Sequence, residues 1–197
     1  MRSESIRSAK SKSTSDGGFT LVEVVIAMML LSMVALGVAQ LFGIAIQRNM
    51  AARYQTSTTV LAGQKLEQLR ALTLGFDAAS GLPVTDMSTN LTTEPPTSGG
   101  GGLNPSPSNS LSQNTPGYVD YLDSRGNLLG TGAAPPATAL YIRRWNISPL
   151  PTNPNNTLIL QVLVTTVNRD RQTPATGARR RAADEALVAT LKTRKAK

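Results

Sequence analysis

The sequence predicts an α+β fold in which a long N-terminal helix packs by its C-terminal half on a small antiparallel β-sheet. No proline interrupts the chain between Phe19 and Leu82, so a helix here can be far longer than a small globular domain needs. Three segments between residues 140 and 193 alternate apolar and polar side chains or carry β-branched runs, as strands do. The helix therefore comes first and the sheet last.

The first 18 residues form a polar, basic leader with four basic and two acidic side chains. The leader ends at Gly18, Phe19 follows, and Glu23 stands at the head of a long apolar run. A carboxylate at the edge of a membrane segment usually has a specific partner, and no Lys or Arg lies within two helical turns of Glu23. A cut between Gly18 and Phe19 would supply one, because a new α-amine has a reference pKa of about 7.7–8.0.

Residues 24–47 contain no charged residue and no proline. As a helix this run is about 36 Å long, which is enough to cross a hydrocarbon core of about 30 Å. It is apolar on every side, as expected for a helix surrounded by lipid or by other helices. Residues 19–47 are therefore predicted to span a membrane.

Three interpretations of this segment compete. A secretory signal peptide could be cut after Gly37-Val38-Ala39, but the polar segment before it is long and the apolar run continues to Ile46. A plain single-pass anchor explains the length but not Glu23. A removable leader followed by a retained helix explains both, and we favour it.

Residues 48–72 are predicted to continue the helix with one apolar face. The side chains of this stripe fall within about 140° on a helical wheel and are expected to pack on a sheet. They are Tyr54, Thr58, Leu61, Ala62, Leu66, Leu69 and Leu72, with the stem of Lys65 among them.

Residues 73–117 are predicted to be a flexible loop region rich in Gly and Pro. The four glycines at 99–102 do not make a phosphate loop, because no Lys-Ser or Lys-Thr follows them. A short strand from Tyr118 is expected to turn at residues 125–127. Asp120, Asp123 and Asn127 could form a calcium loop, but the EF-hand spacing is absent and an acidic, solvated turn is favoured.

The remaining strands are expected at residues 140–147, 157–168 and 185–193, with a polar and basic connection at 169–181. The first strand places Tyr141, Arg143, Trp145 and Ile147 on one face. Residues 118–197 therefore form a predicted antiparallel β head with a basic C-terminal tail.

Composition argues against catalysis. The chain has no Cys and no His, so the usual zinc sites, thiol nucleophiles, disulfides and histidine bases are excluded. We predict a protein that is not an enzyme and uses no cofactor and no metal.

The net charge of +8 is unevenly distributed. Residues 71–124 carry five acidic and no basic side chains, whereas residues 125–197 carry 12 basic and three acidic ones. Arg179, Arg180 and Arg181 could contact DNA, but no aromatic residue lies near them to stack on bases, and a solvated loop is favoured. Complementary contact between the two regions, within or between subunits, is the competing explanation.

The segment Asp16-Gly-Gly-Phe-Thr-Leu-Val-Glu23 and the apolar run after it resemble the class III signal of type IV pilins and pseudopilins. The resemblance implies cleavage by a prepilin peptidase between Gly18 and Phe19 and methylation of the new N-terminus at Phe19. It also implies that Glu23 neutralises the N-terminus of a neighbouring subunit during assembly. The fold it implies is pilin-like.

Over most of its length the chain resembles the minor pilins of the PilV type in type IVa pili. Residues 61–70 and the pattern Tyr141-x-Arg-x-Trp145 carry this likeness, while the C-terminal Cys pair of many pilins is missing. The expected function is a minor pilin that helps to prime or cap the type IV pilus. The alternatives are a minor pseudopilin of a type II secretion system and a single-pass membrane anchor with a basic, DNA-binding head.

The implied partners are the prepilin peptidase and, through a helix bundle, other minor pilins and the major pilin. The expected location is the inner membrane, with a cytoplasmic N-terminus and a periplasmic head, and then the pilus at the cell surface. Four basic residues in the leader agree with this orientation, although Arg48, Arg53 and Lys65 follow the apolar run on the other side.

Overall fold

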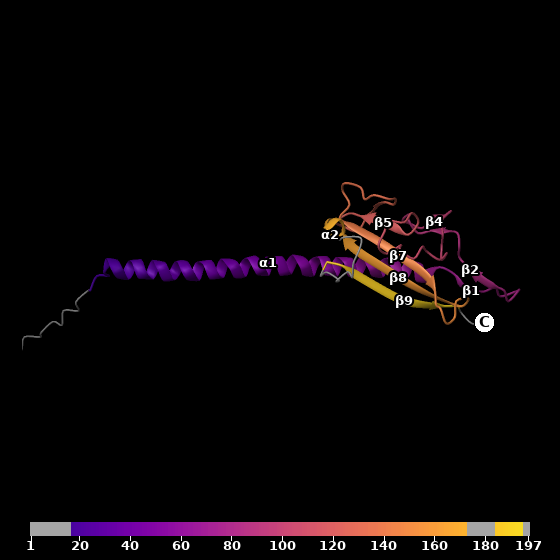
Figure 1. Cartoon of the computed structure of the whole chain (residues 1–197), viewed down its shortest axis with the longest axis horizontal. Coiled ribbons are helices and arrows are strands. Elements are labelled where there is room, and N and C mark those ends of the chain that lie inside the picture. The colour runs from indigo at the N-terminus through magenta and orange to yellow at the C-terminus, as the bar shows by residue number, and fades with distance from the viewer. Residues whose placement is uncertain (1–16, 173–183, 195–197) are drawn as a thin grey trace, which may run out of the picture. The chain divides into compact units, whose positions relative to one another are not determined.

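The α+β, pilin-like arrangement expected from the sequence is confirmed by a computed structural model, which describes residues 17–172 and 184–194. A long helix, α1, precedes all of the strands (Figure 1). The chain divides into two compact units, Met1–Ile46 and Gln47–Lys197. Below, residues 21–46 of α1 are called the apolar segment and residues 47–197 the globular unit.

Helix α1 comprises Leu21–Ala71, 51 residues, and ends one residue before the predicted position. Its sequence contains no proline, and it is rich in Ala, Leu, Met and Gln, which favour helix. The buried side chains of α1 are separated by three or one positions, as on one face of a helix. They are Thr58, Leu61, Ala62, Lys65, Leu66 and Leu69, and all of them belong to the predicted stripe.

The main sheet of the globular unit has five strands in the order β6-β5-β7-β8-β9, and every neighbouring pair is antiparallel. The predicted antiparallel sheet is therefore confirmed. Its strands are β5 (Val119–Leu122), β6 (Leu128–Gly130), β7 (Tyr141–Pro149), β8 (Thr157–Thr166) and β9 (Ala186–Thr193). The β5–β6 turn contains Gly126 at φ +86°, in the left-handed region that favours glycine.

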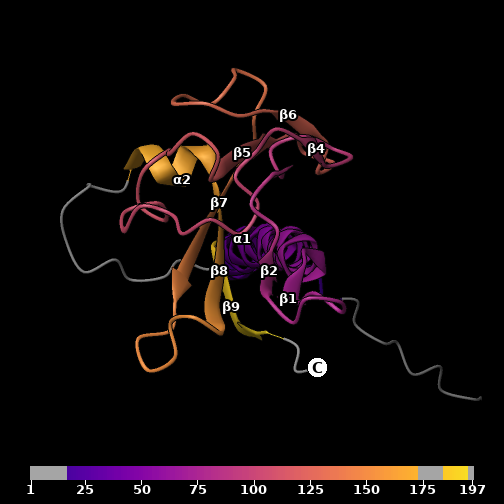
Figure 2. The same cartoon turned by 90° about the vertical axis from the view of Figure 1, so that its right-hand side faces the viewer.

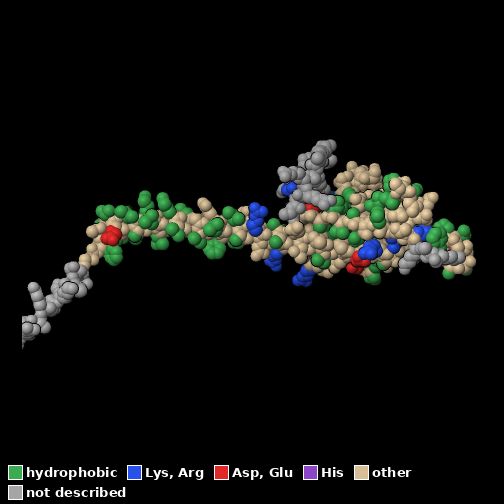
Figure 3. Space-filling view, turned by 90° about the horizontal axis from the view of Figure 1, so that it is seen from below, with side chains coloured by type: hydrophobic (Ala, Val, Ile, Leu, Met, Phe, Trp, Pro, Cys, Tyr) green, Lys and Arg blue, Asp and Glu red, His purple; other side chains and the backbone are tan. Residues whose placement is uncertain are grey.

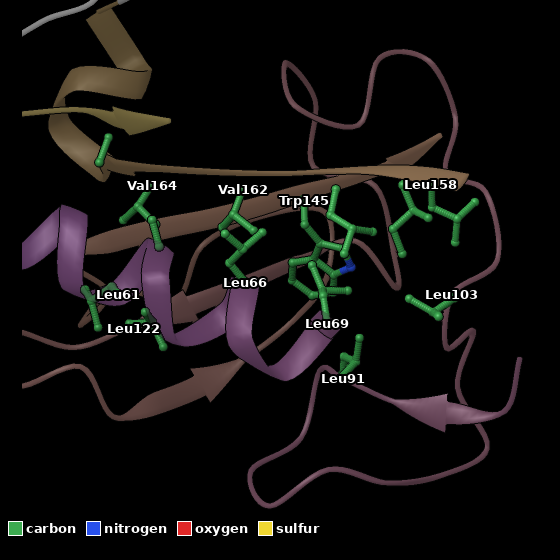
Figure 4. Packing of buried hydrophobic residues seen from close by; sticks show 14 of the residues in the cluster. Leu61, Leu66, Leu69, Leu91, Leu103, Leu122, Trp145, Leu158, Val162 and Val164 are labelled. Atoms are coloured by element: carbon green, nitrogen blue, oxygen red, sulfur yellow. The ribbon is translucent and has the colours of Figure 1, made fainter. Parts of the chain in front are cut away.

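The core of the globular unit lies between the stripe of α1 and the sheet. Leu66 and Leu69 of α1 approach Trp145 of β7 and Val162 of β8 (Figure 4). Trp145 is 1% exposed and is the largest fully buried side chain in the described part of the chain. Each buried Leu or Val contributes about 1.5–3 kcal/mol by leaving water, so this contact holds the C-terminal half of α1 on the sheet.

Residues 73–117 are more structured than predicted. They contain four short strands in two antiparallel pairs: β1 (Leu74–Phe76) with β2 (Pro83–Thr85), and β3 (Thr89–Asn90) with β4 (Thr97–Ser98). Leu91 and Leu103 enter the core. A Cβ on Gly100 would lie 2.2 Å from the Cα of Asn90, so this glycine permits a close backbone approach rather than only freedom of movement.

A second helix, α2 (Val167–Gln172), was not predicted. The strand expected to reach Asn168 ends instead at Thr166, and α2 begins at the next residue. Val167 packs with Ile142 in a second apolar cluster, and Figure 2 shows α2 and α1 on opposite sides of β7 and β8. Asp170 accepts hydrogen bonds from Arg144 of β7, which fixes α2 on this face.

Candidate functional site: the N-terminal motif and the apolar helix

The predicted cleavage site lies just before α1. Residues 17–20 are outside regular secondary structure, and all four are exposed. A Cβ on Gly18 would meet no atom within 4 Å, and the side chain of Phe19 is 80% exposed. The peptide bond between Gly18 and Phe19 is therefore accessible, and the regular hydrogen bonding of the helix does not protect it.

Thr20 caps the N-terminus of α1. Its Oγ1 accepts a hydrogen bond from the backbone N–H of Glu23 at 3.3 Å, and its carbonyl oxygen accepts one from the N–H of Val24 at 3.2 Å. The spacing Thr20-x-x-Glu23 is that of a capping box, a signal that the sequence reasoning missed. It gives Glu23 a local reason to stand in the first turn, because a carboxylate there interacts favourably with the positive end of the helix.

Glu23 nevertheless remains exposed, so its side chain can also meet a group from another molecule. It lies in the first turn of α1, close to the predicted new N-terminus at Phe19. The cap uses the backbone N–H of Glu23 and not its carboxylate, so both carboxylate oxygens can accept hydrogen bonds from a cationic amine.

The apolar segment is exposed on all sides within the chain. Every residue from Leu21 to Met50 is exposed, and Figure 3 shows hydrophobic side chains distributed over the visible face of this part of α1. The helix reaches a mean hydropathy of 2.5 and is long and apolar enough to cross a membrane. A continuous apolar surface of this extent marks contact with lipid or with other helices.

A buried ionic cluster joins α1 to the sheet in the globular unit. Asp120 of β5 is fully buried and accepts from Arg143 Nε at 2.9 Å, from Arg143 Nη2 at 2.8 Å and from Lys65 Nζ at 2.8 Å. Lys65 Nζ also donates to the carbonyl oxygen of Leu91 at 2.6 Å and lies 4.3 Å from the ring centroid of Trp145. Since each charge has several partners, the cluster fixes how the helix sits on the sheet.

Two cations share one carboxylate in this cluster, and this affects the titration of Lys65. Burial lowers the pKa of Lys65 from 10.5 to about 8; Asp120 opposes this shift and Arg143 adds to it. The amine of Lys65 is therefore much easier to deprotonate in the folded protein than in the unfolded chain.

The cluster corrects the sequence interpretation of Asp120. This residue is neither in a solvated turn nor free for calcium, because its carboxylate is occupied by Lys65 and Arg143. Asp123 lies in the turn as expected, but it accepts hydrogen bonds from Arg125 and Asn127. In residues 17–172 and 184–194 no three His, Cys, Asp or Glu side chains are placed to hold a metal ion.

The predicted contact between the acidic middle and the basic C-terminal half is found within the chain. The Asp120–Arg143 pair is one instance. Arg194 also joins the two regions, although not by charge pairing: its guanidinium donates to the backbone carbonyl oxygens of Gly75 and Val84 at 2.7 and 2.8 Å. Arg179, Arg180 and Arg181, the predicted basic contact, lie outside the described residues.

The globular unit also contains an open groove of about 630 Å³ beside α1. Its lining includes Leu61 and Gln64 of α1, Glu94, and Arg125 of the β5–β6 turn. One carboxylate, one guanidinium and several hydroxyl and amide groups line it.

Residues 14–39 match the family model described as the prokaryotic N-terminal methylation motif. No curated protein and no solved structure matches the chain.

The matched residues cover the predicted cleavage site, the cap and the apolar segment as far as residue 39. They constitute a prepilin-type signal, which indicates a type IV pilin-like or pseudopilin protein. Such a signal implies processing by a prepilin peptidase. Together with the exposed apolar helix, it indicates membrane anchoring.

Proposed function

We propose that this chain is a minor pilin of the type IV pilus that helps to prime or cap pilus assembly. The observation that carries the proposal is the order of parts at the N-terminus. An accessible Gly18–Phe19 bond, a capped helix start and a long exposed apolar helix follow one another without a break. A motif of this kind serves assembly rather than catalysis.

In this proposal the peptidase cuts between Gly18 and Phe19, and the amine of Phe19 is methylated. The leader, residues 1–18, is removed with its four basic and two acidic side chains. The mature chain then carries a net charge of +6, from 16 basic and 10 acidic residues. The segment of residues 19–47 lies in the inner membrane through apolar contact, without a covalent anchor, so it can move into a bundle of similar helices.

Glu23 has a specific part in that transfer. Within a helix bundle the environment is apolar, and an unpaired charge is costly there. The carboxylate of Glu23 in one subunit and the terminal amine of another neutralise each other, so each new subunit completes an ion pair with its neighbour. This pairing would favour the position in the helix bundle at which the Glu23 carboxylate lies level with the terminal amine of a neighbouring subunit.

The globular unit supplies the periplasmic part of the subunit. Its core and its ionic cluster fix the orientation of the C-terminal half of α1 on the sheet. A rigid unit of this kind can present a defined surface to other minor pilins. Asp120 of the acidic middle pairs with Arg143 of the basic C-terminal half within the chain. Exposed charges such as Arg125 are the ones proposed for contacts between subunits.

A minor pseudopilin of a type II secretion system has the same signal and the same helix, so the motif favours it equally. Deletion of the gene separates the two proposals. Loss of surface pili with normal export of secreted enzymes supports the pilus, whereas loss of export with normal pili supports the secretion system.

The role of Glu23 is tested by Glu23→Ala in cells that assemble the complex. We expect normal cleavage and about tenfold or greater loss of incorporation, because a buried amine is left without its counter-ion. Thr20→Ala is the matched control, since it removes the helix cap but keeps the charge. Equal incorporation of Glu23→Ala and the unaltered chain would remove the charge-pairing argument.

A further inference from the structure

Two arginines follow the apolar segment on α1. Arg48 comes immediately after the charge-free run of residues 24–47, and Arg53 follows five residues later. Both side chains are exposed. At a rise of about 1.5 Å per residue, the two positions are about 7.5 Å apart along the helix axis.

The globular fold does not cover these arginines. The first buried side chain of α1 is Thr58, which lies beyond both of them. Neither arginine takes part in the ion pairs found among residues 17–172 and 184–194. The acidic residues of α1 are Glu23 and Glu67, each more than three helical turns away along the helix, and Glu67 already pairs with Arg70.

The spacing of the two arginines matches one layer of a bilayer. The hydrocarbon core is about 30 Å thick and the whole bilayer about 40–45 Å, so each headgroup layer is about 5–8 Å deep. A helix whose charge-free run fills the core places Arg48 at the start of this layer and Arg53 near its outer edge. The long side chain of arginine can also extend toward the interface from either position.

Arginine suits the groups found at that depth. Its planar guanidinium forms paired hydrogen bonds with phosphate oxygens and keeps its charge at all physiological pH values. In a lipid such as phosphatidylglycerol the phosphate keeps a net negative charge, whereas in phosphatidylcholine a cationic group compensates it. Anionic headgroups therefore attract basic side chains near the membrane surface.

We propose that Arg48 and Arg53 bind the phosphate groups of anionic phospholipids and so fix the depth of α1 in the membrane before assembly. This inference rests on the proposed function only in requiring that the helix spans a bilayer. It adds a partner, the anionic lipid headgroup, and two residues that determine how deeply the helix lies in the bilayer.

The test uses the absence of cysteine from the chain. Met50, between the two arginines and 52% exposed, is replaced by cysteine and labelled with a fluorophore. The full chain is placed in phosphatidylcholine vesicles that contain a small fraction of nitroxide-headgroup phosphatidylglycerol or, in parallel, of nitroxide-headgroup phosphatidylcholine. Quenching reports which lipid gathers beside residue 50.

We expect quenching by the phosphatidylglycerol probe to exceed that by the phosphatidylcholine probe about threefold at low salt. The preference should disappear in the double variant R48Q/R53Q. It should persist in R125Q/R171Q, which loses the same charge from two exposed arginines of the globular unit. Equal quenching by both probes in the otherwise unaltered chain would overturn the inference.

Two further results have distinct meanings. If neither probe quenches the label, the helix has not entered the bilayer, and the membrane step of the proposed function fails with the inference.

Sodium chloride and inorganic phosphate are also compared at equal ionic strength. Equal loss of the preference supports a headgroup contact, whereas loss with phosphate alone would show binding of free phosphate and overturn the lipid assignment.

Discussion

The two parts of α1 have the same secondary structure but opposite surroundings. Leu36, in the apolar segment, is 65% exposed, whereas Leu69, in the part that packs on the sheet, is fully buried. Residues 58–69 bury one stripe and keep polar side chains on the other side, but residues 24–47 have no polar side to turn to water. The sheet therefore covers the apolar stripe of residues 58–69, whereas the apolar segment needs a membrane or other helices to cover it.

The two parts also differ in where their charged residues lie. In the apolar segment the one charged residue is Glu23, at its exposed start. Four charged side chains are buried in the described part of the globular unit, and all of them are hydrogen-bonded: Lys65, Asp120 and Arg143 in the ionic cluster, and Arg144 beside α2. The apolar segment, which is the most apolar part of the sequence, buries no side chain within the chain. The core of the globular unit, in contrast, includes an ionic cluster.

Removing the anion of this cluster should have the largest effect on the globular unit. Asp120→Asn leaves Lys65 and Arg143 buried without a counter-ion, and we expect a loss of about 3–5 kcal/mol in the free energy of unfolding. Urea unfolding in detergent, followed by the fluorescence of Trp145, measures it.

The matched control is Glu67→Gln, which removes an exposed ion pair with Arg70. Its expected cost is about 0.5 kcal/mol or less. If the two variants were equally stable, the buried cluster would not hold the helix on the sheet.

A pair of leucine truncations tests the comparison between the halves of α1 directly. Leu69→Ala should cost about 3 kcal/mol of unfolding free energy, because it opens a cavity against the core. Leu36→Ala should change the same quantity by less than about 0.5 kcal/mol, since this side chain is 65% exposed. A similar cost for both would mean that the apolar segment also packs within the chain.

The change of unfolding free energy with pH should be smaller than the effects of Asp120→Asn and Leu69→Ala. The pKa of Lys65 is lowered from 10.5 to about 8, so between these values the unfolded chain binds more protons than the folded one. Stability must then rise with pH across this window, by an amount on the order of 2 kcal/mol between pH 7.5 and 10.

The raised pKa values of Tyr118 and Tyr121 act in the opposite direction only near and above pH 10, so the interval below that value is the one to measure. Lys65→Met keeps the volume and the Asp120–Arg143 pair, and its stability curve should be flat there. A rise that persists in Lys65→Met would assign the effect to another group.

Local patterns predicted most of the elements. The proline-free run and the 3.6-residue spacing of the stripe predicted α1 to within a residue of its end, and alternation predicted β7 and β9 closely. These signals are carried by neighbours in the chain, so they can be read without knowing the fold.

Long-range contacts could not be predicted in the same way. Lys65 and Asp120 are 55 positions apart and meet only when β5 joins the sheet beside β7, so no local pattern relates them. Leu91 and Leu103 lie in segments with few apolar residues and become core residues because the rest of the sheet leaves room for them. For the candidate site, the Thr20-x-x-Glu23 spacing of the helix cap could have been recognised in the sequence. The partner that we propose for Glu23 would belong to another subunit, so no pattern within the chain points to it.

Cleavage should make Phe19 the first residue of a retained helix. The intact mass of the membrane-extracted protein, from cells with and without active prepilin peptidase, tests this. We expect a mature chain that starts at methylated Phe19 when the peptidase is active, and the full chain when it is not. A mature chain that starts at Gln40, or one that retains Met1 in the presence of active peptidase, would contradict it.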